Sequence, residues 1–306
     1  SAPELVAPNW TVGASGDFPT LQAAIADVNV VNGHVIHVLP GTYNVTSTLQ
    51  INKQLTIIGD SDNPATVTFE TPNDGTAPTT MIQVSVNNVR LLGMTFRHRK
   101  TTATSVETAI GVSGGGFPQT RVSGFVLGHC RIEHVEFGVV VRGADWMIKD
   151  SEIAYVEVGQ PANSTRRHVG LYGISGNCFI DGIVFEDQTI SGNTRAITPT
   201  STTGTNPNET YVGNLVIKNC TQLGRMQQFY LQDGHQGDPG GYNLWFTDNT
   251  VNEYSVFVGF YGTAANFGDI IGHINASGNT FSNAHNTLGK GMVTADGAGT
   301  FRSSIL

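Results

Sequence analysis

The segment 232–241 combines ionisable side chains with a glycine-rich turn. Its sequence, QDGHQGDPGG, places the carboxylates of Asp233 and Asp238 on either side of the imidazole of His235. Hydrolysis of a glycosidic bond with inversion needs two carboxyl groups roughly 6.5–9.5 Å apart, one as acid and one as base. We therefore predict Asp233 and Asp238 as catalytic carboxylates with His235 assisting. The alternative is a corner turn, where Asp and Gly are common for backbone reasons alone.

A third candidate carboxylate is Glu186, which is followed directly by Asp187 after an apolar run. One acid of such a pair can have a raised pKa and act as a general acid. The alternative is an exposed acid pair without a catalytic role. The sequence thus adds Glu186 to the candidate catalytic residues.

Two groups of side chains have the chemistry to bind a sugar polymer. Aromatic rings on either side of 232–241 could stack on sugar rings, and the basic run 166–168 could bind a carboxylate or sulfate through paired N–H donors. The alternative for the basic run is a solvated loop. The predicted substrate-binding residues are Arg166, Arg167, His168, Tyr230, Tyr242 and Trp245.

Charge is unevenly distributed along the 306 residues. The chain has a net charge of −8, but the window 90–167 contains ten of the sixteen Lys and Arg residues and nets +3. An acidic chain with few lysines does not suit general nucleic-acid binding. The basic window predicts a girdle facing an anionic glycan, with pairing between neighbouring strands as the alternative.

The remaining composition excludes several kinds of site and location. Cys130, Cys178 and Cys220 cannot all pair and have no short metal spacing, so we expect small buried thiols and no disulfide framework. The histidines also lack ligand spacing, so we expect no metal and no cofactor; the alternative is a Ca²⁺ ion bound by oxygen ligands at an Asp-rich corner. The sequence contains no run of 18 uncharged apolar residues, so we expect no membrane span. The first residues do not resemble a secretory signal.

One helix is expected, over 17–32. Leu21, Ala24, Ile25 and Val28 follow helical spacing, and Asp17 is the expected N-cap. After this segment the chain consists of short β-branched or aromatic runs broken by Gly, Asn and Asp.

Those runs repeat at intervals of 21 to 37 residues, each as a strand, a Gly/Asn/Asp/His bend and a second short strand. This pattern predicts a single all-β solenoid domain over 1–306, in which each coil pairs with its neighbours. The helix would cap the first coil. Stacking the coils by their bends aligns three sets of side chains: Lys149 with Asp181 and Lys218, Arg131 with Glu152, and Cys130 with Cys220.

Three segments near the start carry a family resemblance. GDFPTLQAAI at 16–25, VIHVLPGTY at 35–43 and LQINKQLTIIG at 49–59 resemble the opening of right-handed parallel β-helix proteins of the pectate-lyase-like superfamily. This superfamily includes pectin esterases, polysaccharide lyases, galacturonidase-type hydrolases and phage tailspikes. The resemblance implies the fold and a glycan partner. The catalytic signatures of these enzymes are missing: 177–186 lacks the second aromatic-Gly pair of an esterase strand, and Gly234-His235 is the sole echo of the galacturonidase set.

We therefore expect a protein that binds a surface polysaccharide and, if it is an enzyme, cleaves its glycosidic bonds. The expected protein is of tailspike or secreted type and is extracellular or part of a virion. The alternative is a non-catalytic virion decoration, spike or adhesin that uses the solenoid as a rigid homotrimeric rod among other virion proteins. An esterase or epimerase acting on a polymer is a third option. None of these requires nucleic acid or a membrane.

Overall fold

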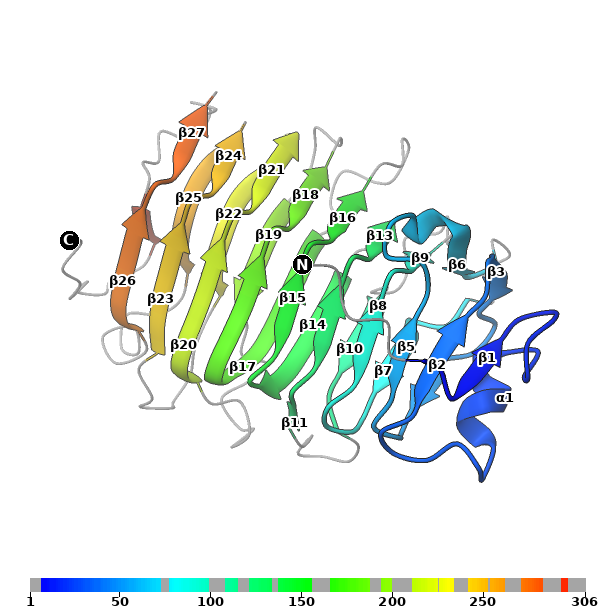
Figure 1. The fold of residues 1–306 in the computed structure, drawn as a ribbon. Helices are drawn as coiled ribbons and strands as arrows, with labels where there is room; N and C mark the ends of the chain where they lie inside the picture. Colours follow the sequence, from blue (N-terminus) through cyan, green and yellow to red (C-terminus); the bar gives the residue numbers. More distant parts are fainter. Residues whose placement is uncertain are drawn as a thin grey trace.

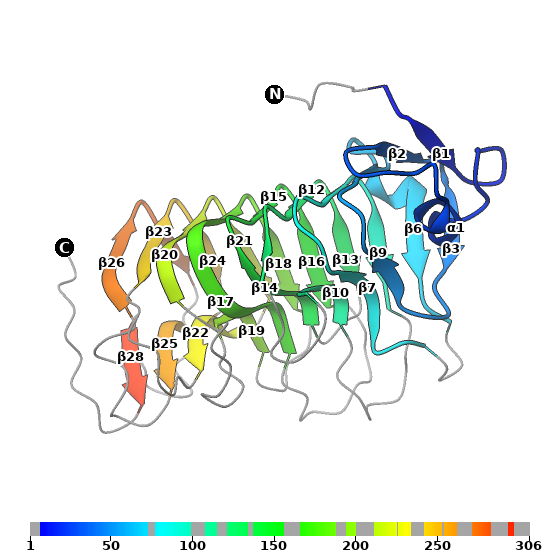
Figure 2. The same cartoon turned by 90° about the horizontal axis from the view of Figure 1, so that it is seen from below.

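The computed structural model describes residues 7–72, 77–98, 108–114, 121–133, 137–155, 166–187, 194–199, 211–224, 226–233, 242–252, 254–261, 271–282 and 293–296. Within these ranges the chain winds into an elongated solenoid whose strands form three axial faces (Figures 1 and 2). Strand pairs form between successive coils and are parallel throughout the described part. The prediction of a parallel β-helix is confirmed.

Face 1 begins each coil and face 2 continues it. Face 1 consists of β4 (Leu49–Ile51), β7 (Thr80–Val84), β10 (Thr108–Val112), β14 (Phe137–Ala144), the first part of β17 (Arg166–Asp181), β19 (Thr194–Pro199), β22 (Met226–Asp233), β25 (Tyr254–Tyr261) and β28 (Val293–Asp296). Face 2 consists of β1 (Trp10–Val12), β2 (Val35–Val38), β5 (Thr56–Ile58), β8 (Arg90–Leu92), β12 (Val126–Gly128), β15 (Met147–Lys149), the last part of β17, β20 (Tyr211–Lys218), β23 (Tyr242–Thr247) and β26 (Ile271–Ser277). The short strand β11 (Val122–Ser123) pairs with the end of β14.

Face 3 closes each coil as a separate sheet. It consists of β3 (Gly41–Asn44), β6 (Val67–Glu70), β9 (Thr95–Arg97), β13 (Arg131–Glu133), β16 (Glu152–Tyr155), β18 (Val184–Asp187), β21 (Thr221–Gly224), β24 (Thr250–Asn252) and β27 (Thr280–Ser282). Figure 1 shows these strands along one edge, above the strands of face 2. A 3-10 turn, η1 (Pro64–Thr66), packs against β6 and β9.

The bend between faces 2 and 3 has the same backbone form in successive coils. One residue there has a positive φ, a region that Gly enters freely and that Asn, Asp and His tolerate better than other residue types. This explains why the repeated bends carry only these four residue types. The bend residues are Gly93, His129, Asp150, Gly182, Asn219, Asp248 and Gly278.

The core is a set of axial columns of inward side chains. On face 3, Tyr43, Phe69 and Phe96 stack with ring centroids 5.1 and 5.9 Å apart and planes tilted by 22° at both contacts. The predicted alignments are also present: Lys149 pairs in register with Asp181, Asp181 with Lys218, and Arg131 with Glu152. Each coil therefore contributes its own slice of the core, which accounts for the even spread of apolar residues along the chain.

The three cysteines are buried and carry no disulfide, as expected. Burial disfavours the thiolate, and it raises the pKa of Cys130 and Cys220 to about 12 and that of Cys178 to about 11. The thiols therefore act as small core side chains.

The helix is shorter than predicted. Helix α1 (Leu21–Ala26) begins after Thr20, whose side chain accepts a hydrogen bond from the Ala23 N–H. Asp17 instead accepts bonds from the backbone N–H and the hydroxyl of Thr11, and Val28 is 85% exposed beyond the helix end. Leu21, Ala24 and Ile25 are buried at the N-terminal end of the solenoid, where Figure 2 shows the helix (α1). No helix in the described ranges is long and apolar enough to cross a membrane.

Candidate functional site

A trough on the outside of face 1 is the candidate site, because arginine and aromatic side chains gather there. Its floor is a row of small residues on neighbouring strands, because Gly111 pairs in register with Val140 and Val140 with Gly170. A cavity of about 280 Å³ lies over this row, across β7, β10, β14 and β17. Since register partners stack between coils, the floor runs along the long axis.

Aromatic rings and guanidinium groups form the two walls of the trough. On one side Arg167 pairs in register with Phe137, and its Cζ lies 5.5 Å from the centroid of that ring. On the other side the Cζ of Arg142 lies 5.0 Å from the centroid of the Tyr172 ring. Both distances are within the range of cation–π attraction, which fixes the guanidinium groups over flat apolar surfaces.

Gln83 closes the end of the trough nearest the N-terminus. Its side-chain amide donates to the carbonyl and hydroxyl of Ser113, at 3.0 and 3.2 Å. A Cβ at position 111 would lie 2.7 Å from the side-chain carbonyl oxygen of Gln83, so a larger residue there would require Gln83 to move. None of the described residues that line the cavity is acidic. The trough therefore offers cationic and aromatic groups on both sides of a flat floor.

The predicted binding residues divide between the surface and the interior. Arg167 lies over the ring of Phe137, which lines the cavity of the trough, and the Trp245 side chain is 37% exposed on face 2. Arg166 and Tyr242 begin β17 and β23, but their side chains lie outside the described part of the structure. The assignment of His168 and Tyr230 to sugar binding is wrong.

Burial explains this correction. Tyr230 pairs in register with Ile197 and is fully buried, with its ring 5.4 Å from that of Phe246. His168 is 1% exposed, and its ring lies 5.9 Å from that of Phe185. Neither side chain can contact a polymer outside the solenoid.

Two of the candidate carboxylates belong to different faces of the solenoid. Asp233 ends β22 on face 1, whereas Glu186 belongs to β18 on face 3. A shared site of Glu186 with the 232–241 segment stays a prediction. His235 and Asp238 lie outside the described residues. Within the described ranges, no group of three or more His, Cys, Asp or Glu side chains could hold a metal ion.

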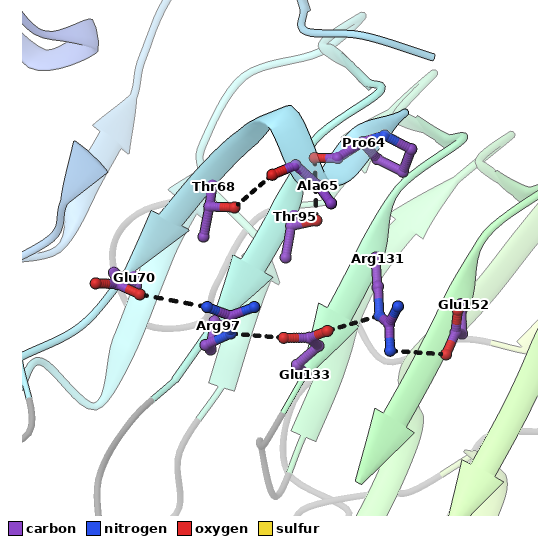
Figure 3. Close-up of polar contacts among 9 residues, drawn as sticks. All are labelled: Pro64, Ala65, Thr68, Glu70, Thr95, Arg97, Arg131, Glu133 and Glu152. Carbon is purple, nitrogen blue, oxygen red and sulfur yellow. Dashed lines mark hydrogen bonds and ion pairs between the residues drawn. The ribbon is translucent and has the colours of Figure 1, made fainter. Parts of the chain in front are cut away.

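Part of the basic window forms a charge ladder on face 3 (Figure 3). Arg97 contacts Glu70 at 3.5 Å and Glu133 at 2.6 Å, and Arg131 contacts Glu133 at 2.6 Å and Glu152 at 3.4 Å. Burial raises the pKa of Glu152, and Arg131 partly offsets this effect. For Arg97 and Arg131 the alternative of pairing between strands is therefore correct, whereas Arg142 and Arg167 lie at the trough.

Sequence reasoning missed Phe137, Arg142 and Tyr172. The repeated bends before face 3 align the coils on faces 2 and 3, and they do not set the register of the face 1 strands. Placing 139–142 (VVVR) over 169–172 (VGLY) brings Arg142 level with Tyr172, next to the observed pair of Val141 and Leu171. That alignment was the available signal.

Comparison with known proteins places this architecture. No protein-family model and no curated protein matches the sequence. A pectin methylesterase, PemA from Erwinia chrysanthemi, has a TM-score of 0.54 at 13% identity over 94% of each chain. A pectin methylesterase in complex with a hexasaccharide has a TM-score of 0.57 at 11% identity, again over 94% of each chain. These structures share the parallel β-helix fold with this chain.

A more distant β-helix neighbour is the PL6 family alginate lyase AlyGC, with a TM-score of 0.50 at 13% identity. It aligns over 92% of this chain and 38% of its own length. At these identities the likeness establishes the β-helix architecture and leaves the chemistry to be argued from the site.

Proposed function

We propose that this β-helix binds an acidic polysaccharide along face 1. The observation that carries the proposal is the axial trough, with Arg167 on Phe137 along one wall and Arg142 on Tyr172 along the other. A guanidinium group binds a carboxylate through two parallel N–H donors, and an aromatic ring stacks on the C–H face of a sugar. A chain of uronic acids repeats the carboxylate and the C–H face of the sugar along its length.

The structural neighbours support the same class of ligand. They are named as pectin methylesterases, one in complex with a hexasaccharide, and an alginate lyase. Pectin and alginate are polymers of uronic acids, so a carboxylate-bearing glycan outside the cell is the ligand class we propose.

The trough predicts a specific loss of binding. Replacing Arg142 with alanine removes a guanidinium group that would donate hydrogen bonds to a carboxylate of the polymer, so affinity for polygalacturonate should fall about tenfold or more. Isothermal titration calorimetry at fixed ionic strength measures this change. Arg90→Ala removes the same charge from an exposed site on face 2 and is the matched control. Equal losses in the two variants would show that general charge attraction, and not the trough, binds the polymer.

We further propose that Asp233, with Asp238 and His235, supplies the catalytic groups if the bound polymer is cleaved. Asp233 belongs to the same face as the trough, and the segment 234–241 connects β22 to β23. A reducing-end assay on a panel of uronic-acid glycans tests cleavage, and absorbance of an unsaturated product separates a lyase from a hydrolase. Binding without any product from the panel would reject cleavage and leave the binding proposal standing.

The expectation of a homotrimeric tailspike or virion protein stays a prediction, since the contacts of a single chain do not bear on it. Native mass measurement of the full chain at micromolar concentration distinguishes a trimer from a monomer. A monomer would reject the rod-like spike as the role of this solenoid.

A further inference from the structure

Face 2 carries a stripe of apolar side chains on its outer surface. Successive register pairs align Val126 with Met147, Met147 with Phe179, Phe179 with Val216, and Val216 with Trp245. None of the five side chains is fully buried, and Trp245 is 37% exposed. We call these five residues the apolar row.

The residues next to the apolar row in sequence show that it points outward. Ile148, Ile180, Ile217 and Phe246 each follow a member of the row, and all are fully buried. Because successive side chains of a strand point to opposite sides of the sheet, the row itself lies on the outside.

Polar rows flank the apolar row on both sides. On one side Asn214 donates to Asn177 at 2.8 Å and Asn243 donates to Asn214 at 3.0 Å. On the other side lie Lys149, Asp181 and Lys218, with the Lys218 ammonium 3.1 Å from the Asp181 carboxylate. The outer surface of face 2 is therefore ordered as amide, apolar and charged rows, all running along the solenoid axis.

We infer that face 2 binds an extended, neutral β-linked polysaccharide laid along the apolar row. Such a chain is an amphipathic ribbon: its ring faces present C–H groups, and its hydroxyl groups project from both edges. Ring faces would stack on the apolar row while hydroxyl groups bond to the amide row and the charged row. Opposite charges pair in the charged row, which favours an uncharged ligand.

The spacing of the rings fits the same ligand. Neighbouring strands lie about 4.8 Å apart, so Phe179 and Trp245, two strands apart, are separated by about 9.6 Å. One strand spacing is close to the length of one pyranose in an extended β-linked chain. Phe179 and Trp245 would then stack on alternate sugar units, with Val216 beneath the sugar between them.

The width of the apolar row argues against a second protein copy as the occupant. The row is one side chain wide, and polar rows border it on both sides. A stable protein interface buries about 800 Å² on each partner around an apolar centre. A single glycan chain covers the row without burying the amide and charged rows in a dry contact.

The experiment measures binding of cellohexaose and mannohexaose to the full chain by calorimetry and tryptophan fluorescence. We expect binding of at least one of them, and affinity at least about tenfold weaker in Trp245→Ala and in Phe179→Ala. Leu223→Ala removes an apolar side chain of similar exposure, 41%, from face 3 and should leave the affinity unchanged. Circular dichroism confirms that each variant is folded.

Three outcomes would overturn this inference. They are no binding of either hexasaccharide, equal affinity in wild type and Trp245→Ala, or a concentration-dependent dimer that Trp245→Ala abolishes. The result for face 1 is separate, because Arg142→Ala should weaken polygalacturonate binding and leave hexasaccharide binding intact. Failure at one face therefore does not decide the other.

Discussion

Replacing Phe96 with alanine is expected to lower the free energy of unfolding by about 3–5 kcal/mol. Phe96 is 2% exposed and stacks on Phe69 with a centroid distance of 5.9 Å. Its removal leaves a cavity that cannot collapse, because the strands of face 3 are held by hydrogen bonds to the coils on either side. The adjacent contact between Phe69 and Tyr43 loses support at the same time.

Urea unfolding followed by far-ultraviolet circular dichroism measures this loss. Phe179→Ala is the matched control, because it removes the same ring from the outside of face 2, where burial is partial. We expect the control to cost less than about 1.5 kcal/mol, since only part of the apolar area is buried there. Similar losses in the two variants would contradict the assignment of Phe96 to the core stack.

Replacing Gly213 with alanine is expected to lower the free energy of unfolding by more than about 3 kcal/mol. Gly213 has a φ of +110° and pairs in register with Gly176 at the corner between faces 1 and 2. A Cβ at this position would overlap the carbonyl oxygen of Gly176. Because the obstacle is backbone, no side-chain rotation can relieve it.

The variant Gly33→Ala separates the cost of a positive φ from the cost of steric overlap with the added Cβ. Gly33 also has a positive φ, +89°, but a Cβ there would meet nothing within 4 Å. The free energy of unfolding of this variant should therefore fall only by the cost of holding alanine at a positive φ, about 1–2 kcal/mol. Thermal and urea unfolding of the two variants side by side give the comparison. A Gly213→Ala protein as stable as Gly33→Ala would show that the corner opens to accept a methyl group.

The fold could be predicted from the sequence because successive coils repeat the same local pattern of bend residues and alternating apolar residues. The bends at Gly93, His129, Asp150, Gly182 and Asn219 need a positive φ, and the residue types that tolerate it are few. Alternating apolar residues around those bends then predict which side chains are inward. The same reasoning predicts the observed alignment of Lys149 with Asp181 and Lys218.

The site was harder to predict because it depends on register between distant segments. Arg142 and Tyr172 meet only when β14 and β17 are stacked, and β15 and β16 separate the two strands in the chain. Tyr230 shows the opposite failure: its aromatic ring suggested sugar binding, but its strand position places it in the column of Ile197. Residue type indicates what chemistry a side chain can do, and its position in the strand decides whether that side chain faces the core or the outside of the solenoid.

The predicted helix, 17–32, is longer than α1 for a related reason. The apolar spacing continues through Val28, but the helix ends at Ala26 and Val28 is 85% exposed. Periodicity shows which residues share a helix face, and it does not show how far that face is buried.

The parallel pairing of strands also determines how the molecule bears a mechanical load. Backbone hydrogen bonds between coils point along the long axis, so tension along that axis pulls directly on them. The bonds that join two neighbouring coils share the load, and each pair of coils transmits the same force to the next. A polymer dragging on this solenoid would therefore peel it coil by coil from an end, while the coils still stacked would keep their shape.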